Sequence, residues 1–342
     1  MKITDLYSKE WDFLFPRIEK NNLPHAILMS GQKGIGKYLF AEYLAQFLLC
    51  ENEEKLTKQK PCGKCQGCLW FLKKQHPDFR QVLPTILQPD PDSKKAPSPY
   101  ILIEQMRALT DFLVLSTHRQ GLRIVLIYPA EAMNLNAANA ILKSLEEPIP
   151  NTLFILITHQ KERLLPTILS RCQELHFQTP DFEKSLEYLK ENKNDDIEKN
   201  KMALAFFSGA PILAETELKQ GFLNKEWLKE LIKILNKGSK VDPIASAKIF
   251  EKMLRDKNLD LFKFMDAAQK WLIDLILLKF TQKNRFFIQY TESQIKLNYY
   301  FALDKALSFY PQFLQKKQQL SQPLNPKLFL EEFFLQYRAL FL

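Results

Sequence analysis

The stretch HAILMSGQKGIGKYLF, residues 25–40, decides the fold of this chain. Residues 25–30 form an apolar run typical of a buried strand, and the apolar spacing of a helix follows to about Cys50. Between them, residues 31–38 (GQKGIGKY) match the phosphate-loop pattern G-x-x-x-x-G-K-[ST] at every position except the last. A strand, a glycine loop and a helix in this order predict a P-loop α/β domain.

The residues of this loop have distinct expected roles. Backbone amides around Gly31, Gly34 and Gly36 would surround phosphates at the helix N-terminus, and Lys37 would reach the β and γ oxygens. Tyr38 takes the place of the hydroxyl that normally binds Mg²⁺, and its side chain is too long to put a hydroxyl there. The loop is therefore predicted to be degenerate, and its binding of ATP or ADP stays open, with a glycine turn that binds nothing as the alternative.

A second apolar run, residues 123–128 (RIVLIY), reads as a central strand. P-loop ATPases place an acidic residue, often two, at the end of such a strand to hold Mg²⁺ and orient water. Here the two positions are Tyr128 and Pro129, and Glu131, further along, is expected to point elsewhere. Without a hydroxyl or a carboxylate to hold the metal, we predict that the chain does not hydrolyse ATP.

Further strands are predicted at residues 79–83, 153–158 and 173–177, with helices at 103–115, 134–146 and 163–169 between them. Alternating strands and helices predict a parallel sheet covered on both faces. Proline-rich residues 83–99 read as a loop, and no strand is expected after Pro180. The predicted domains are 1–178 (α/β, P-loop), 179–222 (small and helical) and 223–342 (all-α, ending in a helix over 327–342).

Three cysteines follow the spacing C-x₂-C-x₂-C, at Cys62, Cys65 and Cys68, and Cys50 supplies a fourth thiol. No signal peptide precedes them, so the chain is expected in the cytoplasm, where thiols stay reduced. Four thiolates suit a closed, structural Zn²⁺ site, here a module over residues 50–68. An iron–sulfur cluster is the alternative.

The fifth cysteine, Cys172, follows Ser170 and Arg171. Alone, Cys172 is typical of a buried core thiol. Arg171 has two interpretations: a finger aimed at a neighbour's γ-phosphate, or a surface arginine in a salt bridge.

Composition excludes several classes of protein. Apolar residues make up 46% of the 342, which excludes intrinsic disorder. No apolar run approaches the ~18 residues that span a bilayer, so no membrane partner is expected. A net charge of +9 is compatible with a nucleic-acid partner without requiring one.

Several motifs occur together in a characteristic order: LPHA at 23–26, the phosphate loop, the four cysteines, HPD at 76–78, IEQMR at 103–107, NAILKSLEEP at 139–148 and SRC at 170–172. This set resembles the AAA+ clamp-loader subunits of bacterial DNA polymerase III over residues 1–178. The resemblance implies a RecA-like AAA+ domain, a helical lid and a helical collar that joins subunits in a ring. Coverage beyond residue 178 is weaker, with SGAP at 208–211 at the sensor-2 turn of the lid.

Because it departs from the motor subunits, gamma and tau, the chain resembles the delta-prime branch of this family. Tyr38, Tyr128 with Pro129, and Ile212 replace residues that the motors use on ATP. The resemblance implies that Arg171, positioned by Ser170 and Cys172, serves ATP on an adjacent motor subunit. Thr158 matches the sensor-1 position.

The implied partners are delta and gamma/tau, and through the complex the β sliding clamp and primer–template DNA. Whether the chain counts as an enzyme is left open: it would belong to the polymerase holoenzyme, a nucleotidyltransferase complex, without ATPase activity of its own. Two alternatives remain: an ATP-hydrolysing motor subunit of the gamma/tau type, and a free-standing zinc-dependent DNA-binding protein.

Overall fold

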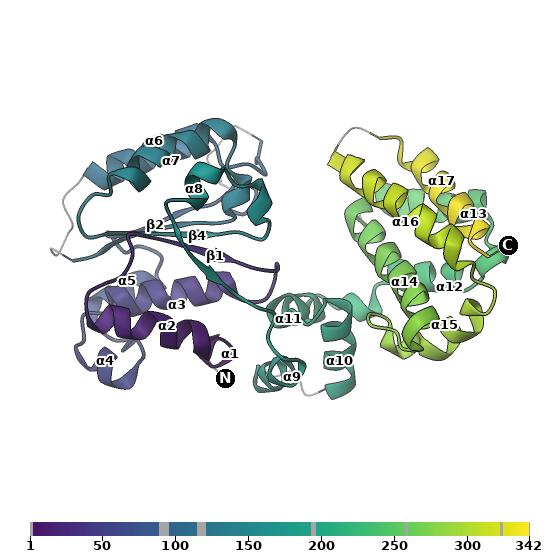
Figure 1. Cartoon of the computed structure of the whole chain (residues 1–342), viewed down its shortest axis with the longest axis horizontal. Helices are drawn as coiled ribbons and strands as arrows, with labels where there is room; N and C mark the ends of the chain where they lie inside the picture. Colours follow the sequence, from purple (N-terminus) through teal and green to yellow (C-terminus); the bar gives the residue numbers. More distant parts are fainter. Residues whose placement is uncertain are drawn as a thin grey trace. The chain divides into compact units, whose positions relative to one another are not determined.

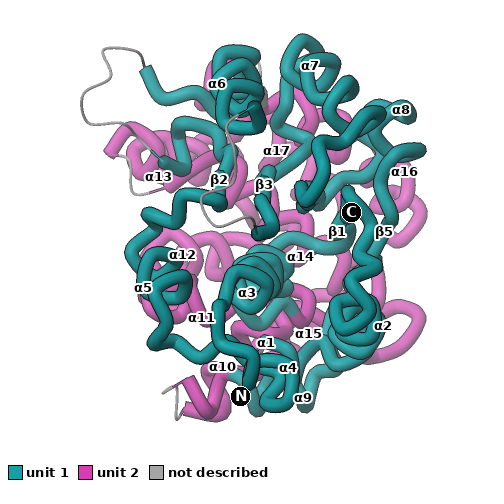
Figure 2. Tube along the Cα trace, turned by 90° about the vertical axis from the view of Figure 1, so that its left-hand side faces the viewer, with its two compact units in different colours: residues 1–188, 210–212 teal, residues 189–209, 213–342 magenta. Residues whose placement is uncertain are grey.

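The computed structural model describes residues 3–88, 96–114, 121–192, 196–256, 259–321 and 324–341. The chain forms two compact units (Figure 2): residues 1–188 with 210–212, and residues 189–209 with 213–342. Residues 89–95 of the predicted loop, residue 115 of a predicted helix, Pro323 and Leu342 lie outside the described residues. The division into three domains stays a prediction.

A five-stranded parallel sheet forms the centre of the first unit, with the order β2-β3-β4-β1-β5. The strands are β1 (Ala26–Ser30), β2 (Phe79–Val82), β3 (Arg123–Ile127), β4 (Thr152–Ile157) and β5 (Gln173–His176). Every residue of β1, β3 and β4 is buried, as the continuous apolar runs predict. All five predicted strands are confirmed to within one residue at either end.

Helices cover both faces of this sheet, and Figure 1 shows α6, α7 and α8 on one face and α2, α3 and α5 on the other. The helices of the first unit are α1 (Ile3–Leu6), α2 (Ser8–Glu19), α3 (Lys37–Leu49), α4 (Glu54–Lys58), α5 (Gln66–Leu72), α6 (Ile103–Val114), α7 (Leu135–Glu146) and α8 (Pro166–Leu169). Met106, Phe112 and Ile141 from α6 and α7 share a buried core with Val125 and Phe154 of the sheet. This packing holds α6 and α7 against the sheet whose strand ends carry the candidate site.

The described residues of the second unit form helices and no strand, as predicted. Two helices, α9 (Phe182–Glu191) and α11 (Pro211–Lys219), belong partly to each unit. The others are α10 (Ile197–Phe206), α12 (Glu226–Leu235), α13 (Pro243–Arg255), α14 (Leu261–Thr281), α15 (Thr291–Asn298), α16 (Leu303–Gln318) and α17 (Pro326–Ala339). Short 3-10 helices lie at Ala130–Ala132 and Lys161–Arg163 in the first unit, and at Phe222–Asn224, Gly238–Lys240, Ile288–Tyr290 and Gln319–Ser321 in the second.

A buried hydrogen-bond chain ties three helices of the second unit together. The indole Nε1 of Trp271 in α14 donates to the Tyr337 hydroxyl in α17 at 3.0 Å. That hydroxyl donates to the carbonyl of Leu235 at the end of α12 at 2.8 Å. Both polar groups are satisfied inside an apolar core, which favours one arrangement of the helices. Among the described residues, no helix has the length and apolarity needed to cross a bilayer.

Candidate functional site

The degenerate phosphate loop lies at the carboxyl edge of the parallel sheet, where ligands of α/β proteins commonly bind. The loop follows β1, Tyr128 follows β3, and Thr158 and His159 follow β4. Since β3, β4 and β1 are neighbours in the sheet, these residues meet although they are far apart in sequence. Thr158 is fully buried, and its Oγ1 accepts from the amide of Gln160 at 3.1 Å.

Lys37 was expected to reach phosphate oxygens. In the structure its amino group contacts other groups of the protein. Its Nζ donates to the carbonyls of Gly31 at 2.5 Å and Gln32 at 2.6 Å and lies 3.0 Å from His159 Nδ1. Only 2% of the residue is exposed. Burial lowers the pKa of Lys37 to about 8, against the opposing effect of the Glu131 charge. The ammonium group already has three partners within hydrogen-bond distance.

Tyr38 and Tyr128 occupy the two positions at which a P-loop ATPase holds its Mg²⁺. Their ring centroids lie 4.9 Å apart at an interplanar angle of 49°. The Tyr38 hydroxyl accepts from Gln81 Nε2 at 3.0 Å, and the same amide group donates to Glu42 Oε1 at 3.2 Å. Burial raises the pKa of both tyrosines, so both are neutral at physiological pH. Two neutral phenols offer Mg²⁺ none of the carboxylate ligands that it prefers.

His159 and Glu131 complete the site, and His159 was not among the predicted site residues. The His159 ring packs edge-to-face on Tyr128 at a centroid distance of 5.5 Å. Burial, followed by the positive charge of Lys37, lowers the pKa of His159 to about 3, so the ring is neutral. Glu131 Oε1 accepts from the backbone amide of His159 at 3.0 Å. The expectation that Glu131 points elsewhere is therefore wrong: it caps the end of β4 and its charge acts on Lys37.

Apolar residues close over the loop from two sides. The amide of Ile212 donates to the carbonyl of Gly34 at 3.1 Å, which brings the predicted sensor-2 position to the loop. A Cβ on Gly36 would lie 2.8 Å from Ile3 Cδ1 and 3.2 Å from Ile212 Cγ1, and its φ of +113° also favours glycine. The sensor-2 position thus contributes an aliphatic contact and no positive charge.

The four predicted metal ligands come together at the end of α3 and the start of α5. The sulfur atoms of Cys50, Cys62, Cys65 and Cys68 all lie within 4.8 Å of one another. The Cys62–Cys68 and Cys50–Cys65 sulfur pairs are each 3.9 Å apart, far beyond a disulfide bond length. A tetrahedral site with metal–sulfur bonds of about 2.3 Å would place sulfurs about 3.8 Å apart. The cluster could therefore hold a metal ion.

Backbone amides point at these sulfurs, as expected for thiolate ligands. Cys62 Sγ accepts from the amides of Cys65 at 3.2 Å and Lys64 at 3.4 Å, and these bonds lower the pKa of Cys62 to about 6. Gly67 is required where α5 passes the end of α3, because a Cβ there would lie 2.5 Å from the carbonyl oxygen of Leu49. The backbone between the cysteines therefore has a conformation that directs amide groups at the sulfur atoms of the cluster.

Arg171 lies at the surface in a shallow depression lined by His25, Leu145, Glu146 and Ser170. Its Nη1 donates to the carbonyl of Thr167 at 2.8 Å and to the Ser170 hydroxyl at 3.2 Å. Its Nη2 lies 2.7 Å from Glu146 Oε1, and the side chain is 32% exposed. The geometry is compatible with both predicted interpretations, a salt-bridged arginine and one that reaches a neighbour.

Cys172 packs against the core beneath the sheet face covered by α6 and α7. It is partly rather than fully buried, and burial raises the pKa of its thiol to about 11. A protonated thiol in apolar surroundings is unreactive at neutral pH. Cys172 therefore contributes packing to the core, and its positioning of Arg171 stays a prediction.

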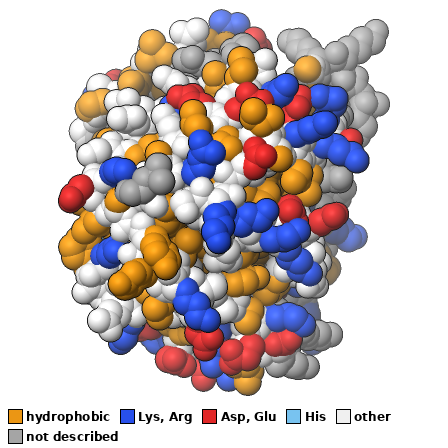
Figure 3. Space-filling model, turned by 90° about the vertical axis from the view of Figure 1, so that its right-hand side faces the viewer, with side chains coloured by type: hydrophobic (Ala, Val, Ile, Leu, Met, Phe, Trp, Pro, Cys, Tyr) orange, Lys and Arg blue, Asp and Glu red, His pale blue; other side chains and the backbone are white. Residues whose placement is uncertain are grey.

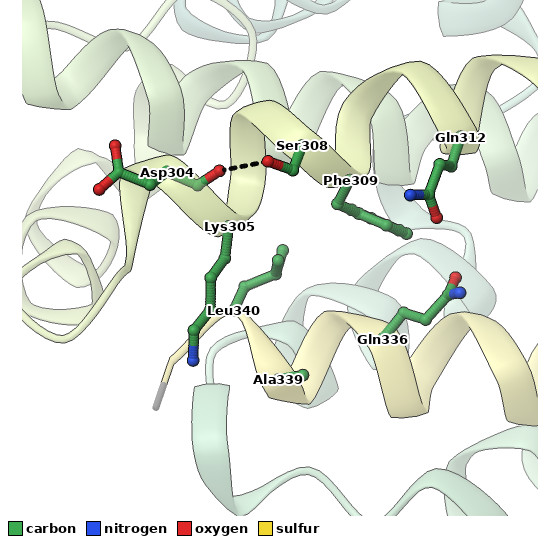
Figure 4. Close-up of a pocket in the computed structure, with 8 residues that line it drawn as sticks. All are labelled: Asp304, Lys305, Ser308, Phe309, Gln312, Gln336, Ala339 and Leu340. Carbon is green, nitrogen blue, oxygen red and sulfur yellow. Dashed lines mark hydrogen bonds between the residues drawn. The ribbon is translucent and has the colours of Figure 1, made fainter.

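A separate surface pocket lies between α16 and α17 in the second unit (Figure 4). It is lined by Asp304, Lys305, Ser308, Phe309, Gln312, Gln336, Ala339 and Leu340. The Ser308 hydroxyl donates to the Asp304 carbonyl at 3.0 Å, a contact within the helix. None of the predicted site residues lines this pocket, and its mixed lining presents no cluster of metal-ligating or nucleophilic groups.

Comparison with known proteins identifies the family to which the chain belongs. A sequence profile described as DNA polymerase III, delta subunit, matches residues 7–181, just over half of the chain. The chain belongs to this family. The match covers the sheet, the phosphate loop, the four cysteines and Arg171, and leaves out Ile3 and Ile212, which contact the loop.

The similar curated proteins include several named DNA polymerase III subunit delta-prime, and one named subunit tau from Salmonella typhimurium, which is 31% identical over 172 residues, 50% of this chain and 24% of that protein. The protein from Pseudomonas aeruginosa is 39% identical over 215 residues, which are 61% of this chain and 62% of that protein. The protein from Bacillus subtilis is 37% identical over 178 residues, 52% of this chain and 49% of the relative. These alignments span less than two thirds of either relative. The resemblance to delta-prime subunits that the motifs predict is confirmed.

One solved structure in the comparison is a gamma-subunit-related DNA polymerase III protein from Thermotoga maritima. It is 19% identical, covers 97% of this chain and 99% of its own, and has a TM-score of 0.44.

Proposed function

We propose that the chain is a delta-prime-type subunit of the DNA polymerase III clamp loader that does not hydrolyse ATP. The observation that carries this proposal is the Tyr38–Tyr128 ring pair where the metal ligands of an ATPase would lie. The partners of Lys37 also support it, because phosphate would have to displace two carbonyls. Without residues that bind Mg²⁺, the chain would contribute a structural subunit to the clamp loader and no site of ATP hydrolysis.

The second part of the proposal concerns Arg171, which would act on ATP bound to a neighbouring motor subunit. An arginine stabilises the charge of a transferring phosphoryl group when it is supplied by a second protein. The exposed guanidinium, fixed at its base by Thr167 and Ser170, supports this role. Ser170 and Cys172 would hold the backbone around Arg171 in place while its guanidinium contacts ATP on the neighbouring subunit.

The metal of the four-cysteine cluster is proposed to be zinc. Thiolates at tetrahedral spacing and four protein ligands support a closed structural site. Bound Zn²⁺ would neutralise the thiolates and hold the ends of α3 and α5 together. No open ligand position is left for a catalytic role.

Delta, gamma/tau, the β clamp and primer–template DNA are the proposed partners, and the cytoplasm the proposed location. Large hydrophobic side chains exposed in the second unit support an assembly role, among them Ile244, Phe280 and Leu328, which are 61–68% exposed. Figure 3 shows hydrophobic side chains interspersed with lysines and arginines on one face of the molecule. The net charge of +9 supports a contribution to holding DNA in the ring.

ATP turnover by the purified chain tests the first part of the proposal. We expect no turnover above a protein-free blank, and the same result for Lys37→Ala. Turnover that Lys37→Ala abolishes would instead identify a motor subunit. Gel filtration of the chain with delta and gamma tests assembly: co-elution in one complex is expected, and separate elution of this chain would favour a free-standing protein.

A further inference from the structure

Glu146 is the acidic partner that the described residues provide for the Arg171 guanidinium. Its Oε1 lies 2.7 Å from Arg171 Nη2, within the range of a charge-assisted hydrogen bond. Glu146 is the last residue of α7, whereas Arg171 follows α8, so two separate elements bring the charges together. The ion pair lies in the open depression described above, where both groups are accessible to a partner.

The pair opposes the role proposed for Arg171. An arginine finger acts through the positive charge that it brings to the transferring phosphoryl group. Carboxylate and phosphate oxygens accept from the same guanidinium N–H groups, so a nucleotide phosphate can replace Glu146 at Nη2. While Glu146 is bound, its negative charge offsets part of the positive charge that Arg171 would bring to a phosphate.

We infer that Glu146 is a positioning residue, a carboxylate latch that holds Arg171 in an unengaged state until a neighbour's nucleotide replaces it. This inference rests on the function proposed for Arg171 and adds regulation to it. The pair is well suited to exchange: the side chains are 32% and 48% exposed, and exposed ion pairs change an equilibrium by about five-fold at most. Thr167 and Ser170 hold Nη1 independently, so Arg171 stays in place when Glu146 releases Nη2.

The test compares Glu146→Gln with Glu147→Gln in the loader assembled from this chain, delta and gamma. Glu147 is the adjacent exposed glutamate and controls for a lost surface charge at the end of α7. Without DNA, Glu146→Gln should raise the rate of ATP hydrolysis by about two- to five-fold, while Glu147→Gln keeps the wild-type rate. An unchanged or lower rate for Glu146→Gln, or equal effects of the two variants, would overturn the latch.

A double substitution tests whether the effect passes through Arg171. In an Arg171→Ala background, Glu146→Gln should change nothing, and a persisting increase would overturn the latch. Gel filtration confirms that each variant assembles. If Arg171→Ala alone leaves hydrolysis unchanged, the proposed function itself fails. If Arg171→Ala lowers hydrolysis and Glu146→Gln has no effect, only the latch fails.

Discussion

The ring of Tyr38 packs against that of Tyr128 with centroids 4.9 Å apart, at the carboxyl edge of the parallel sheet. One tyrosine belongs to the phosphate loop, and the other follows the central strand β3. Each replaces a residue that would hold Mg²⁺ in an ATPase, and together they fill the space between the two elements with a stable contact.

Substitution of Tyr38 separates these two effects. Tyr38→Thr restores the loop pattern but removes the ring contact and the bond from Gln81, so it should lower the free energy of unfolding by about 1–3 kcal/mol. It should not create ATP turnover, because Tyr128 and Pro129 still offer no carboxylate, and the carboxylate of Glu131 accepts from the backbone amide of His159. Tyr38→Phe keeps the ring and should lose about 1 kcal/mol or less. Urea unfolding and an ATPase assay check both variants, and turnover by Tyr38→Thr would contradict the account.

The four-cysteine cluster should carry one zinc ion per chain. Cys68→Ser removes a fully buried ligand and should lower the zinc content to near zero. Cys172→Ser is the matched control, since Cys172 is a thiol of the same unit outside the cluster. Elemental analysis of the purified variants measures the metal. Full zinc in Cys68→Ser, or iron in place of zinc, would refute the prediction.

His159 should make the stability of the first unit depend on pH. Its pKa is lowered to about 3 in the folded chain, against about 6.5 for an unfolded histidine, so the unfolded chain binds more protons between these values. Stability should therefore be complete above about pH 6.5 and fall as the pH decreases toward 3. Between pH 7 and pH 5, this group should account for a loss of about 1–2 kcal/mol.

Urea unfolding of the wild type and of His159→Gln at pH 7 and pH 5 measures this contribution. The variant should lose less stability than the wild type on acidification, because its amide does not titrate. His176→Gln serves as a control, since His176 is an exposed histidine on the edge strand β5. Equal pH dependence in the wild type and in His159→Gln would contradict the buried, neutral state of His159.

Two glycines with positive φ should respond differently to alanine. A Cβ on Gly31 would lie 2.3 Å from the carbonyl oxygen of Phe177, whereas a Cβ on Gly63 would meet nothing within 4 Å. Gly63→Ala should cost about 1–2 kcal/mol for its backbone conformation, and Gly31→Ala clearly more, because backbone must move. Thermal unfolding compares the two. Equal losses would mean that the contact with Phe177 does not constrain the loop.

The apolar runs and the glycine pattern were sufficient to predict all five strands and the loop between β1 and α3. The strands could be predicted because their apolar residues follow one another without interruption. The four-cysteine cluster could be predicted because Cys62, Cys65 and Cys68 lie close together in the sequence. The helices α1 and α2 were not predicted, although Trp11 and Leu14 of α2 are buried. These helices are stabilised by the surface that they cover, and the sequence of the helices alone does not reveal that surface.

The partners of Lys37 could not be predicted for a related reason. His159 lies 122 positions away in sequence, and only the sheet order, with β4 beside β1, brings the two together. The same holds for Glu131 and the amide of His159. A usable signal was present: His159 directly follows the buried residue Thr158 at the carboxyl end of a strand, where ligand-site residues of parallel sheets gather.

ATP hydrolysis by the loader reassembled with substituted chains tests the central claim most directly. Assembly with Arg171→Ala should lower the DNA-stimulated rate by about two-fold or more, because one neighbouring motor loses its finger. Assembly with Lys37→Met should leave that rate at the wild-type value, because the loop of this chain does no chemistry. Gel filtration confirms that both loaders form. A rate lowered by Lys37→Met and unchanged by Arg171→Ala would contradict the account.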